Sequence, residues 1–243
     1  MGNDVKSRLD NANRTGSLQF SGLKLTKIPD EVKKVATLRI MDLSSNKIRT
    51  VDTWIGLLQN IKLLNLSENR LSYLPVEVTR LTKLETLLVS KNTLRTLTPP
   101  SSISNFSALT SLRTVDLSCN CLVDFPVELC TSTIPLDHLN LSNNQISVIP
   151  TCVEALQTIE LNLNENKVDT ISESISRCPR LKVLRLAHNA ITIQAFPMSI
   201  LENSTVSLLA LEDNPLQIKA LQELPAYSKY MERYTATKRK AVP

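Results

Sequence analysis

The stretch that decides the fold runs from Ile61 to Pro75 and reads I-K-L-L-N-L-S-E-N-R-L-S-Y-L-P. Its leucines alternate with other residues, which predicts a short strand with one apolar face. The same frame returns along the chain, and successive frame asparagines are 22 to 28 residues apart. A period of this length predicts stacked structural repeats. The eight frame asparagines are Asn46, Asn69, Asn92, Asn120, Asn144, Asn166, Asn189 and Asn214.

Stacking is what such a strand needs, because one short strand cannot bury its apolar side alone. Each strand can pair with the next in a parallel ladder, and the leucines then close a continuous core. The frame asparagine lies where the chain leaves the strand, and its amide can both donate and accept hydrogen bonds. We therefore predict a structural role for it. Prolines such as Pro75 and Pro126 end the pairing and predict extended or short 3₁₀ return segments.

The frame L-x-x-L-x-L-x-x-N-x-L resembles the leucine-rich repeat family over residues 15–216. The resemblance implies an α/β solenoid, an arc with a parallel sheet on its concave face and short helical, 3₁₀ or irregular turns on its convex face. We expect a capping helix segment at 1–14, about nine coils over 15–216, and a C-terminal cap with a basic tail over 217–243. The insertion at 98–107 is expected to be a convex bulge and a candidate modification loop.

Composition narrows the class of function. The 243 residues carry 28 basic and 23 acidic side chains, a net charge of +5, only four glycines and 4% aromatic residues. These values disfavour glycine-rich phosphate loops and nucleic-acid stacking surfaces. The start of the chain has no apolar segment typical of a secretory signal, and no apolar run approaches the length of a membrane span. Five cysteines without zinc-type spacing predict reduced thiols, and we expect a cytoplasmic protein.

No motif of a known catalytic class is present in the sequence. Cys119 and Cys121 with His138 could be imagined as a nucleophile and base, but they are more simply repeat positions. His138 and His188 fall two repeats apart, too far for a shared metal. We therefore expect no enzyme activity, no cofactor and no metal site.

The residues between the strand leucines are expected to face outward on the concave side, where they mix acid, amide and aliphatic groups. Such a mixture suits protein recognition and lacks the Lys and Arg that a phosphate backbone requires. Ile40, Leu63 and Leu88 form a candidate apolar strip. We predict a monomer that binds an unidentified protein partner on its concave face and does not bind nucleic acid. The candidate binding residues are Asp42, Asn65, Leu88, Asp116, His138, Asn140, Glu160, Asn162 and Arg185.

The first residues carry a second hypothesis. Gly2 after Met1 matches the requirement for N-myristoylation, although the usual Ser or Thr at position 6 is Lys6. Lys6 and Arg8 would favour an anionic membrane leaflet. The start M-G-N and the ending Y-S-K-Y-M-E-R-Y-T-A-T-K-R-K resemble a small family of cytoplasmic leucine-rich repeat proteins. That resemblance implies a non-enzymatic protein with a lipid on Gly2.

Two other functions stay open. One is a regulatory subunit of a phosphatase or of another signalling enzyme, a class that other short intracellular repeat proteins resemble. An RNA-contacting protein that uses the basic ends, such as 238–240, is a third alternative.

Overall fold

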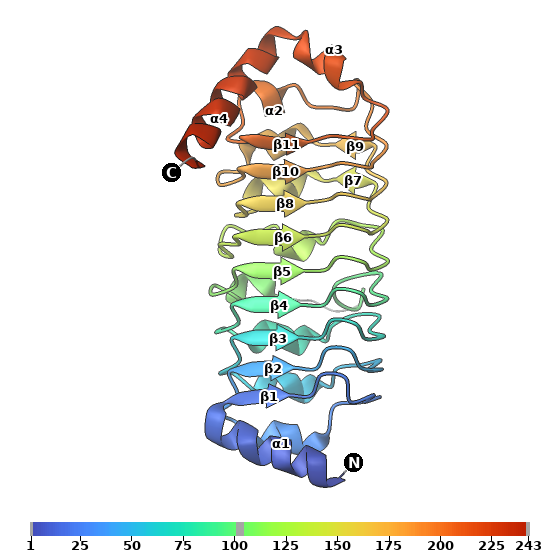
Figure 1. Cartoon of the computed structure of the whole chain (residues 1–243), viewed down its shortest axis with the longest axis vertical. Helices are drawn as coiled ribbons and strands as arrows, with labels where there is room; N and C mark the ends of the chain where they lie inside the picture. Colours follow the sequence, from blue (N-terminus) through green and yellow to red (C-terminus); the bar gives the residue numbers. More distant parts are fainter. Residues whose placement is uncertain (1, 101–104, 242–243) are drawn as a thin grey trace. The chain divides into compact units, whose positions relative to one another are not determined.

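The computed structural model describes residues 2–100 and 105–241, so part of the insertion at 98–107 lies outside the described residues. The chain forms two compact units. The first comprises residues 1–121 and 133–135, and the second comprises 122–132 and 136–243. Each unit is a stack of coils with one short strand per coil, which confirms the predicted leucine-rich repeat fold (Figure 1).

The first unit begins with helix α1 (Gly2–Thr15), which packs beside the first of five parallel strands. The strands lie in chain order in one sheet (Figure 1). They are β1 (Ser17–Gln19), β2 (Ile40–Asp42), β3 (Leu63–Asn65), β4 (Thr86–Leu88) and β5 (Thr114–Asp116). The opposite side carries 3₁₀ helices, namely η1 (Asp30–Lys34), η2 (Thr53–Leu57), η3 (Val76–Arg80) and η4 (Phe106–Ala108).

The second unit repeats this plan and ends in helices. Its main strands are β6 (His138–Asn140), β8 (Glu160–Asn162), β10 (Val183–Arg185) and β11 (Leu208–Ala210), in that spatial order. Two further strands, β7 (Val148–Ile149) and β9 (Thr170–Ile171), pair in a second small sheet. Its helices are η5 (Val127–Leu129), η6 (Thr151–Ala155), η7 (Glu173–Arg177), α2 (Ser199–Glu202), α3 (Ile218–Gln222) and α4 (Pro225–Ala241).

Strand register follows the sequence frame. The central strand residues pair from coil to coil, as Leu64 does with Leu87 and Leu87 with Val115. These central residues are almost completely buried, while their strand neighbours remain partly exposed. The 28-residue repeat keeps the same strand register as its 23-residue neighbour.

Proline leads into the return segments as predicted. Pro29 and Pro75 precede η1 and η3 with φ of −60° and −68°, close to the value that the pyrrolidine ring imposes. Each 3₁₀ helix then buries an apolar side chain, such as Val78 in η3 or Phe106 in η4, against the core. The coil is therefore closed by apolar packing on both of its long sides.

The frame asparagines form the predicted structural ladder. The Nδ2 of Asn69 donates to the carbonyl of Leu43 in the preceding coil at 2.9 Å and to that of Leu66 in its own coil at 3.0 Å. Its Oδ1 accepts from the backbone N–H of Ile48 at 3.0 Å. Asn46 makes the same three-way contact. Each such amide satisfies buried backbone groups that the turn leaves open.

The turn also contains a strained residue that the sequence analysis did not anticipate. The residue directly before each frame asparagine has a positive φ between 53° and 57°, and none of these residues is glycine. This left-handed conformation is costly for residues with a Cβ. The set is Ser45, Glu68, Lys91, Cys119, Asn143, Glu165, His188 and Asp213.

The C-terminal helix α4 covers the last strand and α2. The hydroxyl of Tyr230 accepts from the backbone N–H of Leu209 in β11 at 3.2 Å. The Arg233 guanidinium donates to the carbonyls of Ile200 and Leu201 at the end of α2, at 3.0 and 2.7 Å. These bonds satisfy backbone groups at a sheet edge and a helix end.

Within residues 2–100 and 105–241, no helix has both the length and the apolar character that a membrane-spanning helix needs.

Candidate protein-binding site

In the second unit, five of the candidate binding residues lie on neighbouring strands. His138 and Asn140 come from β6, Glu160 and Asn162 from β8, and Arg185 from β10. The parallel register places His138 opposite Glu160, Asn140 opposite Asn162, and Asn162 opposite Arg185. All five flank buried leucines, so they lie on the outer side of the sheet, which we call the strand face.

Glu160 lies between Arg185 and His138 and contacts both of them. Its Oε1 accepts from Arg185 Nε at 2.6 Å, and its Oε2 lies 3.4 Å from His138 Nδ1. The Glu160 side chain is only 25% exposed, whereas that of His138 is 59% exposed. The carboxylate therefore holds the guanidinium in place between two strands, with the imidazole on its other side.

A hollow of about 210 Å³ lies within the group and is lined by His138, Leu139, Asn140, Glu160 and Asn162. Small-molecule sites are usually larger, from about 300 Å³ upward. The hollow has an apolar floor at Leu139, which is buried, and polar groups around it. It suits one side chain of a protein partner better than a cofactor.

The two asparagines of the hollow also have a structural task that sequence reasoning missed. Asn140 Oδ1 accepts from the backbone N–H of Ser142 at 3.1 Å, and Asn162 Oδ1 accepts from that of Asn164 at 3.0 Å. The signal was visible as Asp or Asn two residues before a Ser or Asn at the strand end. The same contact is made by Asp42, Asn65 and Asp116.

The four remaining candidates belong to the first unit. Asp42, Asn65, Leu88 and Asp116 lie at the same strand position on β2, β3, β4 and β5, and all are half-buried. Among the strip residues, Ile40 is 39% exposed, and Leu63 and Leu88 are half-buried. Asp42, Asn65 and Asp116 are bonded to the backbone at the strand ends. The strand face of the first unit therefore has fewer side chains available for recognition than that of the second.

The thiols of the second unit are poorly suited to nucleophilic chemistry. Cys178 is buried, and its Sγ donates to the carbonyl of Val153 at 2.9 Å. Burial raises the pKa of Cys178 to about 12, and burial together with the neighbouring Cys152 raises the pKa of Cys130. Neutral thiols are weak nucleophiles and weak metal ligands. Among the residues that the structure describes, no three His, Cys, Asp or Glu side chains are grouped as metal ligands.

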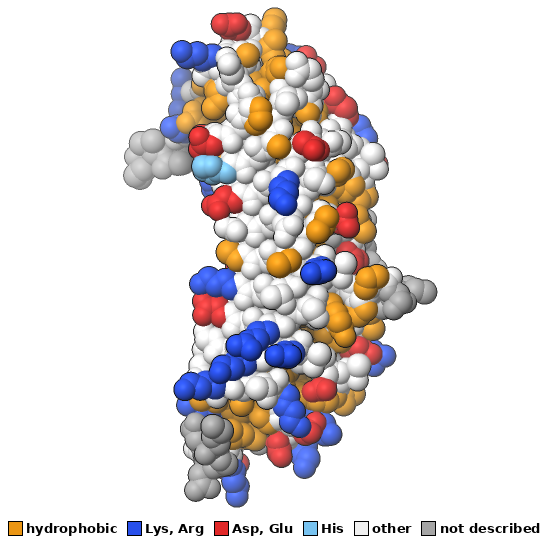
Figure 2. Space-filling model, turned by 90° about the vertical axis from the view of Figure 1, so that its right-hand side faces the viewer, with side chains coloured by type: hydrophobic (Ala, Val, Ile, Leu, Met, Phe, Trp, Pro, Cys, Tyr) orange, Lys and Arg blue, Asp and Glu red, His pale blue; other side chains and the backbone are white. Residues whose placement is uncertain are grey.

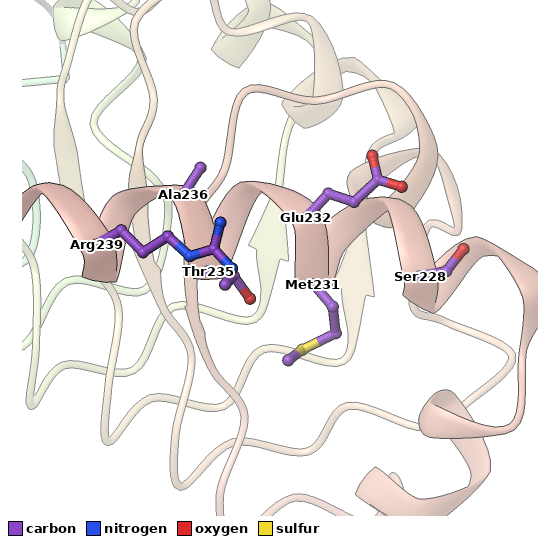
Figure 3. Close-up of a pocket in the computed structure, with 6 residues that line it drawn as sticks. All are labelled: Ser228, Met231, Glu232, Thr235, Ala236 and Arg239. Carbon is purple, nitrogen blue, oxygen red and sulfur yellow. The ribbon is translucent and has the colours of Figure 1, made fainter.

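A hollow on α4 is a different kind of feature. It measures about 510 Å³ and is lined by Ser228, Met231, Glu232, Thr235, Ala236 and Arg239, all from one helix. Figure 3 shows these side chains spread along α4. An open depression along a single helix provides no converging groups that could hold a ligand, so the strand face is the stronger candidate.

Comparison with known proteins agrees with this geometry. Residues 36–94 and 135–156 match models described as leucine-rich repeat. The chain contains leucine-rich repeats. A leucine-rich repeat protein of Leptospira interrogans has a similar structure, with a TM-score of 0.71 and 29% identity over 84% of this chain and 51% of that one.

Two further leucine-rich repeat relatives are longer than this chain. The mouse (Mus musculus) leucine-rich repeat and calponin homology domain-containing protein 1 is 41% identical over 75 residues, which are 30% of this chain and 10% of that protein. The ectodomain of the Arabidopsis thaliana receptor kinase GASSHO1/SCHENGEN3 has a TM-score of 0.65 and 26% identity, over 83% of this chain and 25% of that one. That ectodomain was solved in complex with CASPARIAN STRIP INTEGRITY FACTOR 2.

Proposed function

We propose that the second unit binds a protein partner through its strand face, without catalysing a reaction. The observation that carries the proposal is the small hollow bordered by the Glu160–Arg185 pair and His138. Arginine and histidine held in place by a carboxylate lose little entropy when a partner binds, and arginine is enriched among residues that dominate interfaces. Repeat folds characteristically use such surfaces for binding. A signalling enzyme such as a phosphatase is one partner class that this proposal covers.

The test removes the histidine that lines the hollow and the arginine that pairs with Glu160 beside it. The double variant His138→Ala/Arg185→Ala, compared with wild type in quantitative affinity purification from cells, should lose the partner, with at least a tenfold drop in recovery. The matched control is His188→Ala/Arg177→Ala, which removes the same residue types from outside the strand face, where they pair with Asp213 and Glu154. Equal recovery by both variants, with unchanged far-UV circular dichroism, would contradict the proposal.

We also propose that, in a chain beginning at Met1, Gly2 carries an N-myristoyl group that tethers the protein reversibly to cytoplasmic membranes. Met1 lies outside the described residues, and helix α1 begins at Gly2. The support is the Met-Gly start, since one acyl chain gives marginal, reversible binding. Gly2→Ala should abolish the acyl mass on the intact protein and move it to the soluble fraction, whereas Asn3→Ala should do neither. Wild-type protein that lacks the acyl mass, or a Gly2→Ala variant that keeps it, would refute the lipid.

A further inference from the structure

The turns that follow the strands of the first unit carry a row of cationic side chains. They lie in the first four coils, one to four residues after the frame asparagine or, in the first coil, after Leu23, which stands in its place. We call this row the basic edge. It consists of Lys24, Lys27, Lys47, Arg49, Arg70 and Arg95, all of which are exposed.

Backbone hydrogen bonds bring these turns into one row. The N–H of Lys47 donates to the carbonyl of Leu25 at 2.7 Å, and the N–H of Arg70 donates to that of Ile48 at 2.9 Å. Each turn is thus bonded to the turn before it, at the spacing of about 4.8 Å that separates paired strands. Figure 2 looks onto this side of the molecule and shows Lys and Arg side chains gathered over the coils of the first unit.

The basic edge lacks counter-charges. Within the described residues, none of its six side chains has a carboxylate at ion-pair distance, whereas Lys62 pairs with Glu85 and Lys91 with Glu68, both at 2.7 Å. Like charges stacked at coil spacing repel one another. A surface that keeps six of them unneutralised favours an anionic ligand that spans several coils.

This charge is not a property of the repeat itself. At the equivalent positions after the frame asparagines, the turns of the second unit contain Lys167 as their one Lys or Arg, together with the acid Asp169. The turns of the two units have the same left-handed residue and the same asparagine contact, so the fold does not demand basic side chains there. The cations of the first unit therefore need an explanation other than folding.

We propose that the basic edge binds the anionic headgroups of a lipid bilayer. Two features favour a bilayer over an acidic peptide or an RNA. Helix α1 begins on the side of the first unit toward which the strands run, which is the side of the basic edge (Figure 1). Tyr73, in the turn that contains Arg70, is 40% exposed, and tyrosine prefers the boundary between headgroups and acyl chains.

The proposal goes beyond the tether on Gly2 and rests on it only for the argument from the start of α1, since the basic edge itself would bind headgroups without an acyl chain. Together they would supply the two signals that stable attachment requires. Cations near an anionic surface each strengthen binding about fivefold, and the attraction extends over roughly a Debye length. Six of them are ample for a peripheral contact.

The experiment uses unacylated full-length protein and sedimentation with vesicles of phosphatidylcholine containing about 30% phosphatidylserine. The triple variant Lys47→Gln/Arg49→Gln/Arg70→Gln should bind these vesicles about a hundredfold more weakly than wild type, at about fivefold per cation. Wild-type binding should fall steeply with added salt and should be absent with pure phosphatidylcholine. Because the acyl chain is absent, failure here and failure of the Gly2 proposal are distinguishable.

The control variant has the same net charge as the triple variant above but keeps the basic edge. Lys33→Gln/Lys34→Gln/Arg80→Gln removes three cations from η1 and η3. It should bind within about threefold of wild type, since these charges lie on the 3₁₀ side of the coils. An equal loss in both triple variants would show a net-charge effect and overturn the proposal.

Competition distinguishes the other ligands. Inorganic phosphate, a polyglutamate peptide and a short single-stranded RNA are added to vesicle-bound protein at equal charge concentration and constant ionic strength. None of them should release more than a small fraction. Release by phosphate would indicate a free-anion site, and preferential release by the peptide or the RNA would assign the edge to that class of partner; each result would overturn the bilayer.

Discussion

Replacing Asn69 by alanine tests how the coils are held together. Asn69 is 8% exposed, and its amide serves two carbonyls and one N–H across two coils, at 2.9 to 3.0 Å. Without it, the Ile48 N–H loses its only partner, whereas the carbonyls of Leu43 and Leu66 each lose one of two donors and keep the amides of Asn46 and Asn92. Leaving a buried polar group unsatisfied costs about 1–3 kcal/mol. Because one N–H is left unsatisfied and two carbonyls each lose one of their two bonds, we expect a loss of about 2–4 kcal/mol in the free energy of unfolding.

Urea denaturation followed by circular dichroism measures this loss, and native-state hydrogen exchange locates it. Repeat arrays can lose cooperativity, so exchange of the Ile48 amide is the more direct readout. The control is Asn60→Ala, because Asn60 makes one exposed bond between coils, from its Nδ2 to the carbonyl of Ala36 at 3.0 Å. It should cost less than about 1 kcal/mol. If Asn69→Ala costs no more than Asn60→Ala, the ladder does not have the role described.

Three further outcomes are expected. Cys119→Gly should raise the unfolding midpoint while Cys119→Val lowers it, because Cys119 has φ 53° and a β-branched residue is most strained there. In α4, Tyr230→Phe should cost about 1 kcal/mol and Arg233→Met about 1–2 kcal/mol in denaturant titrations, since the guanidinium serves more carbonyls; the reverse order would contradict the cap geometry. Alkylation at pH 8 should label exposed Cys119 long before Cys178, whose pKa of about 12 leaves about one thiolate in ten thousand. Because the folded protein resists ionisation of this thiol, the contribution of Cys178 to stability is intact below about pH 9, the ordinary thiol pKa. The contribution is lost progressively as the pH rises toward 12. The variant Cys178→Ala should flatten this decline in the free energy of unfolding.

The parts of the fold that sequence could predict are those set by the apolar frame. The period of leucines determines strand position and register, because a slip by one residue would turn the buried side chains outward. The asparagine ladder could also be predicted, because a buried side-chain amide must both donate and accept hydrogen bonds. The two-residue strands Val148–Ile149 and Thr170–Ile171 are too short to leave any period in the sequence.

The site was only partly accessible from sequence. Alternation correctly placed His138, Glu160 and Arg185 on the outer side of the strands, but side-chain torsions decide that the carboxylate lies between them. The turn contacts of Asn140 and Asn162 require backbone geometry. The basic edge was hidden because the net charge of +5 is a sum over the whole chain and does not show where its cations lie.

Site-specific photo-crosslinking in cells tests the central claim most directly. A photoreactive amino acid is placed at His138, beside the hollow, and in a second protein at His188, which is similarly exposed but lies in a turn. The account predicts one discrete crosslinked protein from position 138, lost on Arg185→Ala, and none from position 188. The same adduct from both positions, or from position 188 alone, would contradict binding through the strand face.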